Sequence, residues 1–333
     1  MQGRMRGRAV AEITMVGALN RALRDALAED DRVLILGEDV GKLGGVFRVT
    51  DKLQEEFGEE RVIDTPLAES AIAGASLGLT MAGWRPVAEM QFDGFSYPAL
   101  DQTISHLAKY RYRSRGRQGV PLVVRIPFAG GIGAAEHHSE SPETYYAHTA
   151  GLKVVVPSSA LDAYTLLRQS IADPDPVIFL EPKSRYWSKE TGELSAEGSP
   201  IGAARVVREG GDCTIVAYGA MVARSVQAAS RLSEDGIEAE VLDLRSLVPL
   251  DVEALGTSVR ETGRAVVVHE APMTLGMGAE VAARIREEAF DYLEAPVRRV
   301  TGWDTPYPPA TLEEHYLPTV ARIARAVRET VSY

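Results

Sequence analysis

The sequence predicts an α/β protein with two doubly wound domains. Short apolar runs alternate with segments of helical periodicity, a pattern typical of strand and helix repeats that build a parallel sheet. A polar, turn-prone stretch at residues 183–202 interrupts this alternation, which resumes after it. The 333 residues, 45% of them hydrophobic, are sufficient for two cores. We expect a first domain over residues 1–190, a linker over 191–202 and a smaller second domain over 203–333.

The elements of the first domain follow from these runs. Five apolar runs are the expected strands, at residues 33–36, 86–90, 122–126, 154–156 and 177–180. Apolar residues at helical spacing predict helices over residues 13–28, 70–82, 98–112 and 160–172. Ser158 or Ser159 is the expected cap of the last of these helices. We interpret residues 1–10 as a flexible arm.

The same pattern continues in the second domain. Its expected strands are residues 214–218, 239–244, 265–268 and 297–300, with helices between them and a final helix near 319–330. This order of elements again predicts a mainly parallel sheet covered by helices.

Composition excludes several classes of partner. The net charge of -11 opposes nucleic acid or an anionic membrane as the principal partner. Cys213 is the single cysteine, which excludes an internal disulfide and fits a reducing cytoplasm. The N-terminal stretch lacks the apolar core of a secretory signal, and the longest uncharged segment, 70–84, is too short to span a bilayer. We expect a cytoplasmic protein without a targeting segment.

Glu69 is the first candidate for chemistry. It precedes the uncharged, Gly- and Ala-rich run at 70–84, which offers no cationic partner nearby in sequence. Burial of an unpaired carboxylate costs several kcal/mol or makes it protonate, so such a group is suited to proton transfer. The alternative is an acidic residue in the first turn of a helix, where the helix dipole favours it.

A glycine-rich loop at residues 130–143 is the second candidate. It follows an expected strand and contains groups that titrate near neutral pH, as active-site loops do. A zinc site would use Glu136, His137, His138 and His148, but adjacent histidines usually diverge and no helical His pair is available. The alternative is a capped helix start directly after two surface histidines.

Three other functions are disfavoured. Residues 37–45 match neither the dinucleotide fingerprint nor the Walker loop, and Glu38 and Asp39 would repel phosphate. The chain contains no Gly-x-Ser-x-Gly hydrolase motif. The basic, Tyr-containing segment 109–117 lies in an acidic chain, which favours contact with an acidic partner or another subunit over nucleic acid.

Several dispersed motifs resemble one family from about residue 11 to the C-terminus. They are LGEDV at 36–40, GGVFR at 44–48, DTPLAE at 64–69, KYRYRS at 109–114, HSESPE at 138–143 and FLEPK at 179–183. The chain is similar here to the β subunits of thiamine-diphosphate-dependent 2-oxo acid dehydrogenases. EPK at 181–183, HEAP at 269–272 and GWDTPYP at 302–308 are most like the branched-chain type. The resemblance implies an N-terminal pyrimidine-binding domain and a C-terminal transketolase-like domain.

The resemblance also implies roles for individual residues. Glu69 would bond to a pyrimidine ring nitrogen of thiamine diphosphate, and so promote loss of the thiazolium proton. His138 would stabilise charge or deliver a proton while the acyl group passes to a lipoyl arm. Leu67, Gln91 and Phe95 would line the aminopyrimidine pocket. Phe95 stands where some relatives carry tyrosine, and ordinary core packing would explain it equally well.

The implied metal sites differ in kind. A structural potassium ion would be held mainly by backbone oxygens at Val120, Leu122, Val123, Ser170, Asp173 and Asp175, although a plain strand and helix end would give the same residues. The Gly-Asp-Gly and asparagine motif that holds the diphosphate metal is absent from the chain. We therefore expect a separate α subunit to supply Mg2+ and the diphosphate half of the site in an α2β2 assembly.

Three functions follow from the resemblance. The first is the β subunit of a branched-chain 2-oxo acid dehydrogenase E1 component, which decarboxylates a 2-oxo acid and acylates the lipoyl group of the acyltransferase component, E2. The second is a pyruvate or acetoin dehydrogenase β subunit, and the third is a noncatalytic scaffold. Glu69 and His138 together disfavour the scaffold, and the second domain would mediate β/β contact and docking to E2.

Overall fold

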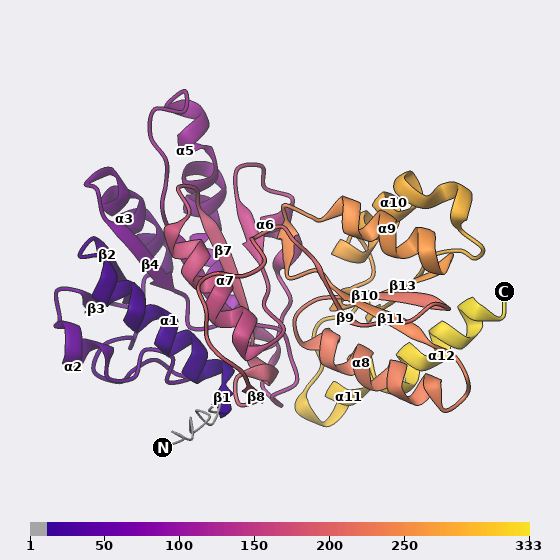
Figure 1. Cartoon of the computed structure of the whole chain (residues 1–333). Helices are drawn as coiled ribbons and strands as arrows, with labels where there is room; N and C mark the ends of the chain where they lie inside the picture. The colour runs from indigo at the N-terminus through magenta and orange to yellow at the C-terminus, as the bar shows by residue number, and fades with distance from the viewer. Residues whose placement is uncertain (1–11) are drawn as a thin grey trace, which may run out of the picture.

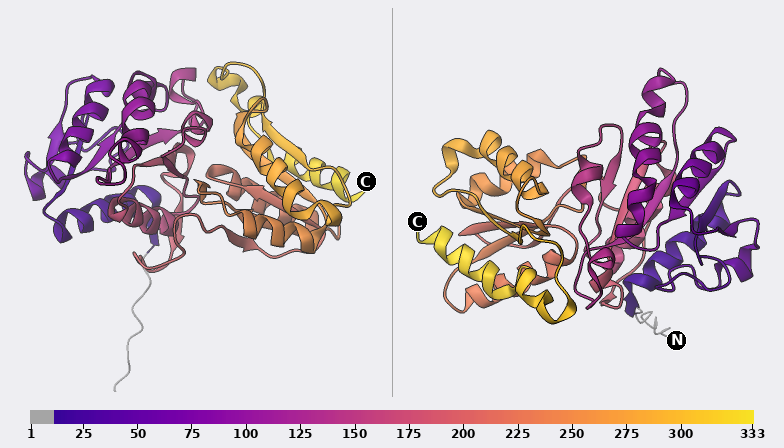
Figure 2. Two further views of the ribbon diagram at one scale, coloured as in Figure 1. Left: turned by 90° about the horizontal axis from the view of Figure 1, so that it is seen from above. Right: turned by 180° about the vertical axis from the view of Figure 1, so that it is seen from behind.

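The computed structural model describes residues 12–333, so the arm predicted at residues 1–10 lies outside the described part of the chain. Two lobes lie side by side, the first in indigo to magenta and the second in orange to yellow (Figure 1). Views from above and behind show the same division (Figure 2). Among the helices of residues 12–333, none combines the length and apolar character needed to cross a bilayer.

The first lobe contains a seven-stranded sheet in the order β12-β6-β7-β5-β4-β2-β3. Its strands are β2 (Val33–Gly37), β3 (Val62–Asp64), β4 (Arg85–Glu89), β5 (Val123–Phe128), β6 (Lys153–Val155), β7 (Val177–Pro182) and β12 (Ser246–Val248). All neighbours pair in parallel except β12, which runs antiparallel to β6. The five predicted strands all belong to this sheet, whereas β3 and β12 were not predicted.

Both faces of this sheet are covered. Val33 and Ile35 pack with α1 and α7, whereas Leu34 and Leu36 face the opposite side with α3. Because successive strand residues point to opposite faces, a strand buried on both sides needs a continuous apolar run. The helices of this lobe are α1 (Met15–Glu29), α2 (Leu53–Phe57), α3 (Glu69–Met81), α4 (Leu100–Gln102), α5 (Ala108–Arg113), α6 (Glu143–Ala147) and α7 (Ala160–Ala172). Ser159 caps α7 by accepting from the Asp162 amide.

The helix predicted over residues 98–112 is not one regular α-helix. It consists of the 3-10 helix η1 (Gly94–Ala99), α4, the π-helix η2 (Thr103–Leu107) and α5 in succession. Pro98 lies inside η1, and proline lacks the amide that a regular helix uses. The local hydrogen-bond pattern therefore changes along a segment whose apolar spacing indicates only a helix.

The second lobe is a smaller α/β unit. Its sheet order is β14-β13-β10-β11-β9, and only β9 is antiparallel to its neighbour. The strands are β9 (Arg205–Arg208), β10 (Cys213–Ala217), β11 (Ala239–Asp243), β13 (Ala265–Pro272) and β14 (Arg298–Gly302). The main helices are α8 (Ala220–Ser233), α9 (Val252–Thr262), α10 (Met277–Ala289), α11 (Glu313–Tyr316) and α12 (Val320–Val331). In Figure 1, α9 and α10 cover one face and α8 and α12 the other, so the predicted α/β class is confirmed in both lobes.

The stretch predicted to be polar and turn-prone is partly folded into the first lobe. Residues 183–191 contain η4 (Lys183–Arg185) and β8 (Lys189–Thr191), and β8 pairs with β1 (Glu12–Thr14). Residues 192–204 contain no helix or strand and run to β9. The short elements η3 (Glu136–His138), η5 (Phe290–Tyr292) and η6 (Ala310–Leu312) complete the chain.

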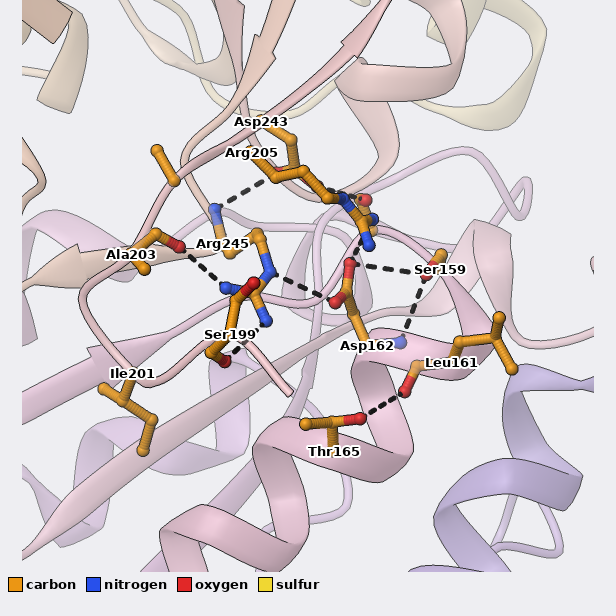
Figure 3. Close-up of polar contacts among 12 residues, drawn as sticks. Ser159, Leu161, Asp162, Thr165, Ser199, Ile201, Ala203, Arg205, Asp243 and Arg245 are labelled. Atoms are coloured by element: carbon orange, nitrogen blue, oxygen red, sulfur yellow. Dashed lines mark hydrogen bonds and ion pairs between the residues drawn. The ribbon is translucent and has the colours of Figure 1, made fainter. Parts of the chain in front are cut away.

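A buried polar cluster joins the lobes (Figure 3). Asp162 on α7 accepts from Arg245 Nε at 3.1 Å and pairs with Arg205 on β9. Arg245 also donates to the carbonyls of Ala203 and Ser199, at 2.7 and 3.1 Å. Arg245 is only 1% exposed, so its charge is stabilised by Asp162 and by the carbonyls between the lobes. Together with β12, this cluster fixes the second lobe against the first.

Candidate functional site

The residues singled out in the sequence gather at the carboxyl ends of the parallel strands. Glu69 opens the helix that follows β3, Gln91 and Phe95 follow β4, and His138 lies in η3 after β5. Parallel strands carry their carboxyl ends to one edge of the sheet, which is where ligands bind in open α/β folds. Gly94 approaches the His137 carbonyl so closely that a Cβ there would lie 2.5 Å from it, which shows that η1 and η3 touch.

Glu69 is buried at the N-terminus of α3, with 9% of its surface exposed. Within residues 12–333 its carboxylate takes part in no hydrogen bond or ion pair, and the preceding Ala68 has no side-chain cap to offer. The free amides of a first helical turn favour a negative charge. Burial raises the pKa of the nearby Glu38, and the charges of Asp39 and Glu69 add to that rise. Glu69 is therefore an acceptor held by the fold without a partner of its own.

His138 lies in an aromatic setting that the sequence only partly predicts. Its ring is edge-on to Phe92 at 4.1 Å and to Phe95 at 5.1 Å between centroids. Burial lowers its pKa below 6.5, and the charges of His137 and Lys183 lower it further. The imidazole is therefore neutral at pH 7, with a ring nitrogen able to accept a proton. Phe92 was not predicted, because a phenylalanine after a strand carries no signal beyond burial.

A buried ion pair lies behind Phe92. Lys183 Nζ is 3.2 Å from Asp93 Oδ1 and 5.8 Å from the centroid of the Phe92 ring, and both charged side chains are fully buried. Burial raises the pKa of Asp93 to about 7 and lowers that of Lys183, while each charge favours the ionised form of the other. Since Asp93 directly precedes η1, this pair anchors the segment that carries Phe92 and Phe95. The two residues are far apart in sequence, so pattern alone does not pair them.

The remaining candidates have less constrained surroundings. Leu67 is 68% exposed, and the Gln91 amide donates to Asp39 Oδ2 at 3.0 Å. His137 is exposed beside Glu136. These residues lie at the same sheet edge, but Leu67 does not contribute to a closed pocket within this chain.

The side chain of Glu140 accepts from the Tyr97 hydroxyl. Burial and this bond raise the pKa of Tyr97. Glu140 also ties the loop together, since its carbonyl accepts from the Ala129 amide at 2.8 Å.

The positions of the implied potassium ion line a corner between the start of β5 and the end of α7. The Val120 amide donates across this corner to the turn after α7 at 2.9 Å. Asp173 accepts from Lys153 Nζ at 2.5 Å and Asp175 from Arg111 Nη1 at 2.6 Å. The six positions are Val120, Leu122, Val123, Ser170, Asp173 and Asp175. Lys153 and Arg111 already balance the charges of Asp173 and Asp175. A potassium ion at this corner would therefore depend on backbone carbonyls.

The fold and site define the class to which the chain belongs. Residues 11–188 match the family Transketolase, pyrimidine binding domain, and residues 202–323 match Transketolase, C-terminal domain. A solved split gene transketolase, described as an inactive beta4 tetramer, superposes with a TM-score of 0.80 at 26% identity, over 96% of this chain and 98% of that one. The order of the two domains agrees with the order of the two lobes.

Sequence relatives narrow this class. The 3-methyl-2-oxobutanoate dehydrogenase subunit beta of Mycobacterium tuberculosis is 56% identical over 96% of this chain and 92% of the relative. The pyruvate dehydrogenase E1 component subunit beta of Leifsonia xyli is 53% identical over 97% and 96%. The 2-oxoisovalerate dehydrogenase subunit beta of Pseudomonas aeruginosa is 45% identical over 97% and 96%. The chain belongs to the family of 2-oxo acid dehydrogenase β subunits, and the predicted resemblance is confirmed.

Proposed function

We propose that this chain is the β subunit of a branched-chain 2-oxo acid dehydrogenase E1 component. Residues 1–190 would form its pyrimidine-binding domain and residues 203–333 its second domain. The observation that carries the proposal is Glu69, a carboxylate 9% exposed at a helix N-terminus, without a partner in the described residues, at the carboxyl edge of a parallel sheet. The name of the 56% identical relative supports the branched-chain assignment.

The residues of this edge fit the aminopyrimidine half of thiamine diphosphate. A buried carboxylate without a partner is complementary to a protonated ring nitrogen, and Phe95 offers an aromatic face nearby. Leu67 and Gln91 would complete the lining, with the exposed Leu67 covered on assembly. The bound cofactor supplies a nucleophilic carbon and an electron sink for decarboxylation.

Glu69 would accept, on its carboxylate, a hydrogen bond from the protonated pyrimidine ring nitrogen. Its low exposure strengthens this interaction, because the electrostatic energy of a charged hydrogen bond rises as the local dielectric falls. His138 would serve the later step. Its imidazole, neutral because burial lowers its pKa, can accept and return a proton at a ring nitrogen while the acyl group passes to the lipoyl arm of E2.

The other half of the site would come from an α subunit. Within residues 12–333 no group of three or more His, Cys, Asp or Glu side chains is arranged to hold a metal ion. We propose that the α subunit supplies Mg2+ and the diphosphate contacts in an α2β2 assembly, and that E2 provides the lipoyl group. The inactivity of the split gene transketolase as a beta4 tetramer supports dependence on a second chain. Bacterial relatives and the free thiol of Cys213 support a cytoplasmic location.

A structural potassium ion at the corner between β5 and α7 is a separate proposal. The proposal is supported by the contact between the segment before β5 and the turn after α7, where the Val120 amide donates to the Pro174 carbonyl. Replacing potassium chloride by choline chloride at equal ionic strength should lower the melting temperature of the purified chain. An unchanged melting temperature would exclude this ion.

The experiment that tests the main proposal is reconstitution with the α subunit. Oxidation of 3-methyl-2-oxobutanoate is expected to exceed that of pyruvate, and the chain alone should be inactive. Preference for pyruvate would support the second candidate, which the 53% identical Leifsonia relative favours. Binding of the cofactor without activity on any 2-oxo acid would indicate a scaffold, and activity of the isolated chain would contradict the division between subunits.

A further inference from the structure

The glycine loop that leads to His138 is held by two carboxylates of the second lobe. The Gly130 amide donates to Glu270 Oε2 at 3.0 Å, and the Gly131 amide donates to Glu313 Oε1 at 2.9 Å. The Gly133 amide is 3.2 Å from each oxygen of Glu313. Three backbone donors of one loop thus point at side chains from another lobe.

The glycines make this approach feasible. A Cβ on Gly130 would lie 1.8 Å from Tyr307 Oη, so only glycine fits there. Gly131 and Gly133 have φ values of 86° and 68°, which glycine adopts without strain. The backbone is therefore free to turn successive amides toward the carboxylates, an arrangement that suits a negative charge.

The two carboxylates are themselves fixed. Glu270 lies on β13 with 6% exposure, and Glu313 opens α11 with 9% exposure. Tyr307 donates to Glu313 Oε1 at 2.8 Å, in addition to the loop amides. Burial raises the pKa of Glu270, whereas the bond from the Gly130 amide opposes that rise. Charged acceptors of backbone amides form stronger hydrogen bonds than neutral ones. We call Glu270 and Glu313, with the loop amides that they bind, the clamp.

We propose that Glu270 and Glu313 are positioning residues of the second lobe, which fix the loop at 130–133 and through it His138. The opposite end of the loop is tied by the bond between the Ala129 amide and the Glu140 carbonyl. His138 therefore lies between two fixed points, and the second lobe contributes to the active site. The link to catalysis rests on the proposed function, whereas the clamp itself does not.

Hydrogen exchange of the reconstituted α/β complex tests the clamp directly. In Glu313→Ala the peptide covering residues 129–142 should exchange at least tenfold faster than in the wild type. Glu313→Gln keeps the shape but removes the charge and leaves the Gly133 amide one acceptor oxygen instead of two, so it should show a smaller increase. The matched control is Glu314→Ala, the next residue, whose exposed side chain pairs with Arg224 and lies outside the clamp.

Turnover of the same variants tests the link to His138. We expect kcat for lipoyl acylation to fall about tenfold in Glu313→Ala, with KM for the 2-oxo acid within about twofold and Glu314→Ala unchanged. If Glu313→Ala fails to fold, Glu313→Gln decides the result. Unchanged exchange in the variants overturns the clamp, and faster exchange with unchanged kcat overturns its role in positioning His138. An inactive wild-type complex would contradict the proposed function alone, because exchange would still report the clamp.

Discussion

The hydroxyl of Tyr218 donates to Oε1 of Glu143 at 2.6 Å, a bond between a side chain of the second lobe and a buried carboxyl group of the first. Glu143 begins α6, directly after the loop that contains His138. Its second oxygen, Oε2, is buried without a partner among the described residues. Burial raises the pKa of Glu143 to about 7, although the bond from Tyr218 opposes the rise. The contact between the lobes therefore contains a group that titrates near neutral pH.

This raised pKa predicts how stability depends on pH. The ordinary pKa of 4.5 applies to the unfolded chain and the value of about 7 to the folded one, so the folded state binds the proton more tightly. The raised pKa of Glu143 contributes up to about 3 kcal/mol to the free energy of unfolding. This contribution is complete below pH 4.5 and is lost as pH rises through about 7. In Glu143→Gln the unfolding free energy, measured with urea, should differ less between pH 5 and pH 8 than it does in the wild type. The exposed Glu193→Gln should keep the wild-type slope; an equal slope in Glu143→Gln would contradict this prediction.

The ion pair between Asp162 and Arg245 should be a main determinant of how the lobes are joined. Asp162→Asn leaves the guanidinium of Arg245 buried without a counter-charge and should cost about 3 kcal/mol of unfolding free energy. Asp235→Asn removes an exposed pair with Arg328 and should cost less than about 1 kcal/mol. Urea unfolding of both variants measures the difference. Equal losses would show that the buried cluster contributes no more than a surface pair.

The pair of Lys183 and Asp93 predicts a double-mutant result. Lys183→Met leaves a buried carboxylate unpaired and should cost about 3–5 kcal/mol, and adding Asp93→Asn should recover part of this loss. Lys189→Met, at an exposed pair with Glu12, is the matched control and should change stability by less than about 1 kcal/mol. Additive losses in the double variant would contradict the coupling.

NMR titration should also show a higher pKa for His138 in Lys183→Met, since the Lys183 charge lowers it.

The sequence predicts the parallel strands well because their apolar runs are buried on both faces, as in residues 33–36. It does not predict β12, whose three residues pair with β6 although they belong to the second half of the chain. Local pattern cannot report such a pairing, since its energy comes from contacts made only after both lobes form.

The candidate site, like the fold, can be predicted from the sequence only in part. Glu69 and His138 are identifiable because each lies in a distinctive local motif, whereas their environment depends on distant residues. Asp93 and Lys183 are 90 residues apart, and Glu313 is 182 residues from Gly131. Glu313 occurs in a stretch that resembles ordinary polar surface, and the HEAP motif that contains Glu270 does not indicate which residue its carboxylate contacts. Only the folded chain shows that they meet the active-site loop.

His138 should be needed for acyl transfer more than for decarboxylation. We expect His138→Ala to lower the single-turnover rate of lipoyl acylation about 100-fold and that of decarboxylation less than about tenfold. His148→Ala, at an exposed histidine, should leave both rates unchanged. Rapid quenching with a reconstituted α/β complex and a lipoyl domain separates the two steps. A larger effect on decarboxylation would assign His138 to the earlier step.

The measurement that tests the central claim most directly is the activity of Glu69→Gln in the reconstituted complex. The amide keeps the shape of the side chain but lacks the negative charge that stabilises the protonated ring nitrogen, so we expect decarboxylation to fall about 100-fold or more while folding and assembly are preserved. Glu55→Gln changes an exposed acid in the first turn of another helix, α2, and should retain full activity. Near-normal decarboxylation by Glu69→Gln would instead show that Glu69 is only a favourable charge at a helix N-terminus.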